Sequence, residues 1–187
     1  MKKLLFTTLL ACLFVFNTSQ AQEEKKSEGL KGAWWGLASG SYSKTEGSDA
    51  VYTILPAVGN FISPTVTVGG AVGYTNAIGG DDTFVVKPLA RKYWSVTEKF
   101  FIFGEANVPL LFSENFSGYG FNIEPGIDYF IGGKWTLEAK FGRFGYNSIK
   151  PDGGDAVGTT SFGFNMFDSQ TQEGLGSGIT LGLKYIF

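Results

Sequence analysis

Apolar residues alternate with small or polar residues between residues 118 and 131, with Phe130 as the exception. An extended chain would carry one set on one face, namely Tyr119, Phe121, Ile123, Pro125, Ile127, Tyr129 and Ile131. The other face would carry Gly120, Asn122, Glu124, Gly126, Asp128 and Phe130. This is the period of a β-strand, in which successive side chains point to opposite faces. Similar alternation in residues 65–77, 134–147 and 176–187 makes a β fold the main expectation.

The rest of the chain supports an all-β fold. After residue 21 no helical segment stands out, and no apolar run approaches the ~20 residues of a membrane helix. The predicted strands cover residues 32–43, 50–61, 65–77, 83–95, 99–112, 118–131, 134–147 and 176–187. The first two strands alternate less clearly, and Pro56 weakens the second because proline cannot donate a ladder hydrogen bond.

The connections between these strands alternate in length. Short turns are expected at "SPT", "VTEK" and "GGK", and longer polar loops at "KTEGSDA", "IGGDD", "SENFSG" and "KPDGGDAVG". Tight turns at one end and longer loops at the other are typical of an up-and-down antiparallel transmembrane β-barrel. We predict eight strands, with residues 159–169 as the outer part of the last hairpin. If that segment is an additional strand, a ten-stranded barrel is the alternative.

The N-terminus has the pattern of an export signal. A basic start, an apolar run over residues 4–16 and a small-x-small site ending at Ala21 predict a signal peptide over residues 1–21, cleaved after Ala21. Residues 22–31 are charged and predict a flexible lead-in, so the barrel would occupy residues 32–187. The only cysteine, Cys12, lies within the signal, so the mature chain would have no disulfide.

The composition disfavours several functional classes. The 187-residue chain contains no histidine, the commonest general base and catalytic metal ligand. Its formal net charge is −2, and no basic patch suggests nucleic acid. We therefore expect a protein that is not an enzyme and that has no catalytic residues, cofactor or metal site.

Several segments resemble the small eight-stranded outer-membrane β-barrels of Gram-negative bacteria, of the OmpA/OmpX type, especially their glycine-rich group. They are the signal peptide, "FISPTVTVGGAVGYTN", "VVKPLARKYW", "KFFIFGEANV", "NIEPGIDYFIGGKWTLEAKFGRFGYNS" and "LGLKYIF". In such proteins the barrel-assembly machinery reads the final strand. The resemblance implies that this signal is carried by Ile179, Leu181, Leu183, Tyr185 and Phe187. It also implies a location in the outer membrane, with lipid around the barrel.

If the glycine-rich face points inward, charged residues enter the barrel. They would be Lys87, Arg91, Glu105, Glu124, Asp128, Glu138, Lys140 and Lys184. An eight-stranded barrel is only just wide enough for its own side chains, so a salt-bridged plug is expected rather than an ion pathway. The expected role is structural, adhesive or envelope-maintaining, carried by extracellular loops whose partner the sequence does not name. A small pore and a secreted, lipocalin-like barrel that binds a lipophile are the alternatives.

Overall fold

The computed structural model describes residues 29–43, 50–78, 81–163 and 180–187, and all regular structure in these ranges is β. The predicted signal peptide with Cys12 and Ala21, most of the lead-in and Ile179 lie outside them. Among the described residues, no helix is long and apolar enough to cross a membrane. The strands are β1 (Trp34–Ser43), β2 (Val51–Ile54), β3 (Ala57–Ser63), β4 (Val66–Ile78), β5 (Asp81–Ser95), β6 (Phe100–Asn107), β7 (Leu110–Phe112), β8 (Phe116–Gly132), β9 (Trp135–Lys140), β10 (Arg143–Pro151), β11 (Val157–Gly163) and β12 (Thr180–Ile186).

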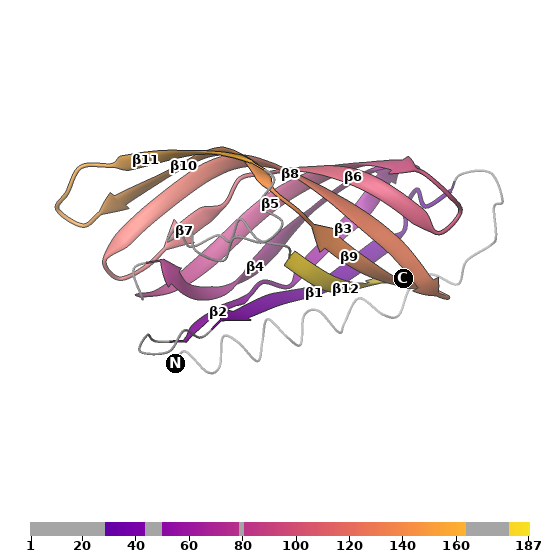
Figure 1. Cartoon of the computed structure of the whole chain (residues 1–187), viewed down its shortest axis with the longest axis horizontal. Helices are drawn as coiled ribbons and strands as arrows, with labels where there is room; N and C mark the ends of the chain where they lie inside the picture. Colours follow the sequence, from indigo (N-terminus) through magenta and orange to yellow (C-terminus); the bar gives the residue numbers. More distant parts are fainter. Residues whose placement is uncertain (1–28, 44–49, 79–80, 164–179) are drawn as a thin grey trace.

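The strands form a closed antiparallel ring (Figure 1). The first strand pairs with the last through the Trp35–Ile186 register, and the backbone N–H of Phe187 donates to the carbonyl of Trp34 at 2.7 Å. β9 pairs with both β12 and β8, which completes the circuit. In the part of the ring that contains the β1–β12 pair, the pairings run in order through β1, β3, β4, β5, β6, β8, β9 and β12. The fold is therefore all-β and antiparallel, and closure leaves no sheet edge here.

Three of the predicted strands are interrupted. β2 and β3 are separated at Pro56 and both pair with β1 and β4; β6 and β7 are separated at Pro109 and both pair with β5 and β8. A proline has no N–H to give the ladder, so regular pairing stops there while the chain keeps its direction. The seventh predicted strand divides at Gly142, whose φ of 82° is left-handed.

The two ends of the ring differ less in loop length than the sequence suggested. At one end, short turns join β3 to β4, β5 to β6 and β8 to β9, as predicted. At the other end, residues 79–80 join β4 to β5, and residues 113–115 join β7 to β8. The expectation of longer loops at these two positions was wrong, because flanking residues extend the strands by ladder pairing.

The β10–β11 hairpin projects beyond the ring (Figure 1). β11 pairs with β10 from Val157 to Gly163, so the described part of the extra segment belongs to the outer part of the last hairpin. The remainder, residues 164–169, lies outside the described residues. The strand number of the whole barrel therefore stays a prediction.

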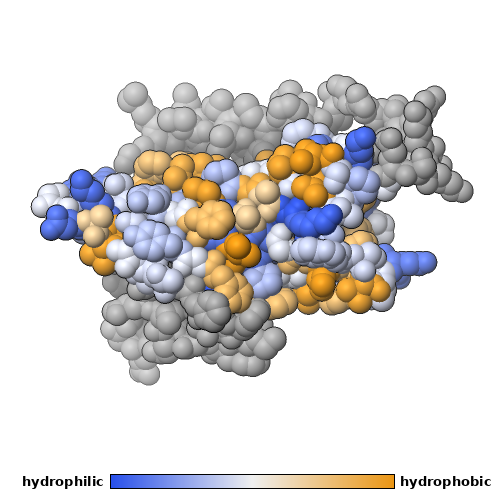
Figure 2. Space-filling view, turned by 90° about the horizontal axis from the view of Figure 1, so that it is seen from above, coloured by the Kyte–Doolittle hydropathy of each residue, from blue (hydrophilic) through white to orange (hydrophobic). Residues whose placement is uncertain are grey.

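The alternation divides the wall into two faces. On β5 the buried residues are Thr83, Val85, Lys87, Leu89, Arg91 and Tyr93, while β8 exposes Tyr119, Phe121, Ile123, Tyr129 and Ile131. Figure 2 shows hydrophobic side chains over much of the visible wall, with weakly polar ones and one strongly hydrophilic patch among them, and hydrophilic side chains at both ends. The glycine-rich, charged face of the predicted strands therefore points inward.

The interior is not uniformly small and polar. At the short-turn end, an apolar cluster contains Trp35, Leu37, Phe61, Leu89, Tyr93, Phe103 and Ile186. A smaller cluster of Val85, Leu111 and Phe116 lies toward the other end. The sequence left the orientation of the first strand ambiguous. In the structure Trp35 and Leu37, which are 0% and 5% exposed, lie on its inward face.

Close packing inside the ring predicts that one glycine cannot be enlarged. A Cβ on Gly126 would overlap the Phe103 ring and lie 2.8 Å from the carbonyl oxygen of Ala139. We expect Gly126→Ala to lower the free energy of unfolding by about 1–3 kcal/mol. Gly104→Ala is the control, because its nearest neighbour, Trp94, is 3.8 Å away. Urea titration of the refolded variants measures both, and equal stability of the two would contradict the packing described.

Candidate functional site

All eight charged residues predicted for the interior lie in one buried network. Lys87 and Arg91 come from β5, Glu105 from β6, Glu124 and Asp128 from β8, Glu138 and Lys140 from β9, and Lys184 from β12. Their side chains are at most 12% exposed. Removing charges from water is costly unless they are paired, so these residues depend on each other for stability.

The network is built around two pairs of directly opposed carboxylates. Glu105 on β6 faces Glu124 on β8, and Asp128 on β8 faces Glu138 on β9. Like charges directly opposite each other on neighbouring strands repel. Each pair therefore requires cations from other strands of the ring.

Two lysines bridge the first carboxylate pair. The ammonium nitrogen of Lys87 lies 3.3 Å from a Glu105 carboxylate oxygen and 3.9 Å from one of Glu124. Lys140 lies 3.5 Å and 3.0 Å from the same two carboxylates. The side-chain amide of Asn107 also donates to Glu105 at 2.9 Å.

Lys184 bridges the second carboxylate pair. Its ammonium contacts Asp128 directly and lies 3.3 Å from Glu138. It also donates to the hydroxyl of Tyr93 at 3.2 Å. The terminal strand therefore supplies the cation that allows Asp128 and Glu138 to face each other.

Arg91 joins the two halves of the network. Its guanidinium donates to Glu138 at 2.6 and 3.1 Å and to Glu105 at 2.7 Å. The two contacts to Glu138 form a bidentate pair, the strongest geometry for this type of interaction. The rings of Trp35 and Phe103 lie 4.7 and 4.9 Å from the guanidinium carbon, so the cation is also held against aromatic faces.

Sequence reasoning missed one charged member of the network. The Nε of Arg143 donates to Glu124 at 3.1 Å, although continued alternation from Trp135 would have turned Arg143 outward. The break at Gly142 changes the alternation and turns Arg143 inward. A glycine followed by a charge, in the middle of a regular strand pattern, was the available signal.

Tyr93 was also not singled out. It occupies the same face of β5 as Lys87 and Arg91, so the alternation itself could have placed it inside. Its hydroxyl accepts from both Arg91, at 3.3 Å, and Lys184.

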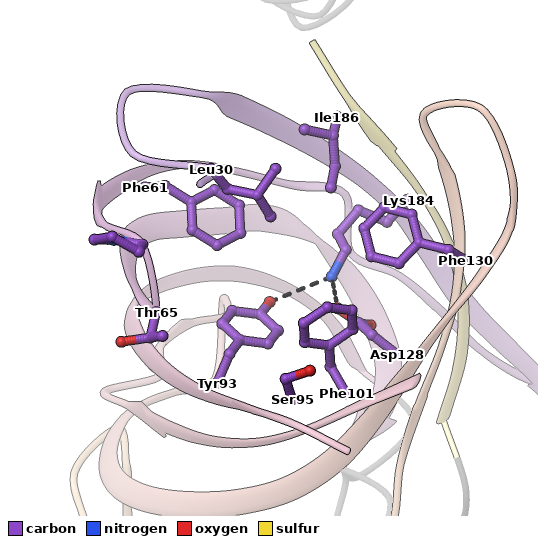
Figure 3. Close-up of a pocket in the computed structure, with 11 residues that line it drawn as sticks. Leu30, Phe61, Thr65, Tyr93, Ser95, Phe101, Asp128, Phe130, Lys184 and Ile186 are labelled. Atoms are coloured by element: carbon purple, nitrogen blue, oxygen red, sulfur yellow. Dashed lines mark hydrogen bonds and ion pairs between the residues drawn. The ribbon is translucent and has the colours of Figure 1, made fainter. Parts of the chain in front are cut away.

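Two small cavities flank the centre of the network. The first, of about 50 Å³, lies at the short-turn end and is shown in Figure 3. Leu30, Phe61, Phe101 and Phe130 surround it, and Lys184 borders it together with Tyr93 and Asp128. One carboxylate oxygen of Asp128 has no hydrogen-bond partner.

The second cavity, of about 90 Å³, lies on the other side of the network. Its polar lining includes Lys87, Asn107, Glu124, Lys140 and Arg143. Arg91, Glu105 and Glu138 border neither cavity, so they fill the section of the interior between them.

The described part of the proposed assembly signal lies on the outer face. Leu181, Leu183 and Phe187 are 66%, 41% and 45% exposed, and Tyr185 is half-buried. The ring of Tyr185 packs edge-on against those of Trp135 and Phe187, at 4.8 and 5.1 Å. Lys184 and Ile186, between these residues, point inward.

No known family model and no curated protein matches this sequence. Among solved structures, the chain is similar to the crystal structure of Neisserial surface protein A. The TM-score is 0.47 and the identity 12%, and the match covers 83% of this chain and 96% of the other.

The bridging role of Lys184 predicts a large and partly recoverable loss of stability. Lys184→Met leaves Asp128 buried without a cation, and we expect it to lower the free energy of unfolding by about 3–5 kcal/mol. Adding Asp128→Asn should restore part of this loss, because the unpaired charge is removed. Lys92→Met, at an exposed lysine of β5, is the control. Urea titration measures the stability of the single, double and control variants, and an equally small effect of Lys184→Met and Lys92→Met would refute the bridging role.

Proposed function

We propose that this chain is a non-enzymatic, integral β-barrel protein of a bacterial outer membrane, with an interior filled by its own side chains. The observation that carries the proposal is the apolar outer wall, which is bounded by two rows of aromatic residues. Soluble proteins rarely expose apolar patches of this extent, whereas a membrane barrel requires them.

The two aromatic rows have the positions of interface girdles. The row near the short-turn end contains Trp34, Trp94, Tyr129, Trp135, Tyr185 and Phe187. The row near the other end contains Tyr74, Phe84, Phe112, Tyr119 and Tyr146. Tyr74, Phe84 and Phe112 occupy matching register positions on three adjacent strands, so they form a continuous line.

The separation of the rows fits a membrane. Phe84 and Trp94 on β5 are ten positions apart (94 − 84), as are Tyr119 and Tyr129 on β8 (129 − 119). Ten residues of strand extend about 34 Å, and a tilt of about 40° reduces this to about 26 Å along the barrel axis. The apolar band of outer-membrane barrels is about 25 Å tall.

The interior supports a closed barrel over the two alternatives. A lipocalin-like carrier needs an apolar chamber large enough for its ligand, whereas the cavity lined by Leu30, Phe61 and Phe130 measures about 50 Å³. A pore needs a continuous polar path, whereas the ion pairs of Arg91 with Glu105 and Glu138 occupy the section between the two cavities.

The role of such a protein would be carried outside the membrane. We propose a structural, adhesive or envelope-maintaining function through the surface at the β10–β11 end. Outer-membrane lipid would be the partner of the wall. The outward set Leu181, Leu183, Tyr185 and Phe187 would be recognised by the barrel-assembly machinery, after export by a cleaved signal peptide.

A charge in the middle of the apolar wall tests the membrane location. On β8, Ile123 lies between Tyr119 and Tyr129, which belong to the two aromatic rows, and it is 47% exposed. Val157, in the projecting hairpin, is 64% exposed. We expect Ile123→Arg to cost about 2–4 kcal/mol of stability in phospholipid vesicles, and Val157→Arg at most about 1 kcal/mol. Urea titration of vesicle-inserted protein, followed by its heat-modifiable gel band, measures both. Recovery of the wild-type chain as a soluble monomer from the periplasm would overturn the proposal.

The filled interior predicts a barrier to ions. In planar bilayers we expect the wild-type protein to show no steady single-channel conductance, because paired side chains occupy its centre. The Arg91→Ala, Glu138→Ala double variant removes both members of the bidentate pair and should produce measurable steps. Large, reproducible steps from the wild type would favour the pore instead.

A further inference from the structure

The two halves of the ion-pair network are not equally balanced in charge. The half toward the short turns sets Asp128 and Glu138 against Arg91 and Lys184, two negative charges against two positive ones. The other half sets Glu105 and Glu124 against Lys87, Lys140 and Arg143, two against three. Counted as formal charges within the described residues, the network therefore has one more cation than carboxylates, next to the 90 Å³ cavity.

Arg143, one of the three cations in this half, has N–H donors without a partner among the described contacts. Of the guanidinium nitrogens of Arg143, only Nε has a partner among the described contacts, Glu124 at 3.1 Å. The side chain is 15% exposed and borders the cavity. A guanidinium has five N–H donors in a fixed plane, so the remaining four are suited to an oxyanion.

A residue that borders the same cavity, Asn107, has an unsatisfied acceptor. Asn107 is 2% exposed and uses its amide nitrogen on Glu105, while its Oδ1 has no hydrogen-bond partner. A buried acceptor without a donor is costly, so a ligand that brings a hydroxyl would relieve it.

We propose that this cavity binds one small oxyanion that carries a hydroxyl group, of the hydrogen-phosphate class. The anionic oxygens are placed at Arg143, Lys87 and Lys140, which already pair with the Glu124 carboxylate that also borders the cavity. The P–OH group donates to Oδ1 of Asn107 once that side chain turns toward the cavity. A cavity of about 90 Å³ holds a free anion and not an acyl chain, so the ligand is a soluble phosphate rather than a lipid headgroup. The barrel is then a binding protein for this ion as well as a membrane scaffold.

Calorimetry with inorganic phosphate tests the site. The full-length mature protein, refolded in a neutral detergent, is titrated at pH 7 with phosphate and separately with sulfate. We expect phosphate to bind with one-to-one stoichiometry and sulfate to bind at least about tenfold more weakly, because sulfate has no proton to give Asn107. Absence of phosphate binding at millimolar concentration would overturn the proposal.

Variants connect the binding to these residues. Arg143→Gln should weaken phosphate binding at least about tenfold, whereas Lys150→Gln, which removes the same charge from an exposed position of β10, should leave it unchanged. Asn107→Leu should abolish the preference for phosphate over sulfate. The heat-modifiable band reports whether each variant folds, and undiminished binding by folded Arg143→Gln would refute the site.

A lipid competitor distinguishes the source of the phosphate. Lysophosphatidic acid in mixed micelles presents the same phosphate monoester on an acyl chain. We expect it not to displace inorganic phosphate, and displacement at equal concentration would assign the site to a lipid headgroup instead.

Discussion

The interior depends on two pairs of carboxylates that face each other across neighbouring strands. Glu105 opposes Glu124 and Asp128 opposes Glu138, an arrangement that is repulsive in isolation. It becomes stable only when cations arrive from elsewhere in the ring. Those cations come from β5, β9, β10 and β12, so the network requires the sheet to be closed and links strands that do not pair with each other.

Alternation produces this interior and the apolar wall together. On β12, Lys184 enters the network while Leu183 and Tyr185 face outward. A shift of one residue would place the lysine on the outside and the leucine among the carboxylates. Two requirements therefore fix the register of β12: the ion pairs inside the barrel and the apolar surroundings proposed for the outer wall.

Much of the fold could be predicted from the sequence, because a period of two is visible residue by residue. This period predicted the orientation of β8 and the eight charged residues that point inward. Breaks in the period were harder to foresee. Pro56 and Pro109 divide strands without changing their course, whereas Gly142 changes the alternation and brings in Arg143.

The pairing of charges was also beyond the sequence. Alternation shows that Glu105 and Glu124 share a face, but only the register between β6 and β8 places them directly opposite. Register depends on turn geometry and on the bulges near Phe61, Thr75 and Phe130, which sequence patterns do not locate. The position of Trp35 over Arg91 likewise needs the closed ring.

Closure of the ring through β1 and β12 has a kinetic consequence. The Trp35–Ile186 register joins residues from opposite ends of the described chain, so this contact has one of the greatest sequence separations in the protein. Such contacts form late, because the entropy of closing a long loop must be lost before they are made. Until β12 docks, Lys184 is absent and both edges of the sheet are open, so Asp128 and Glu138 must stay hydrated. Docking of β12 is therefore the step at which the wall is sealed and the interior loses its water, and assembly is expected to be close to all-or-none.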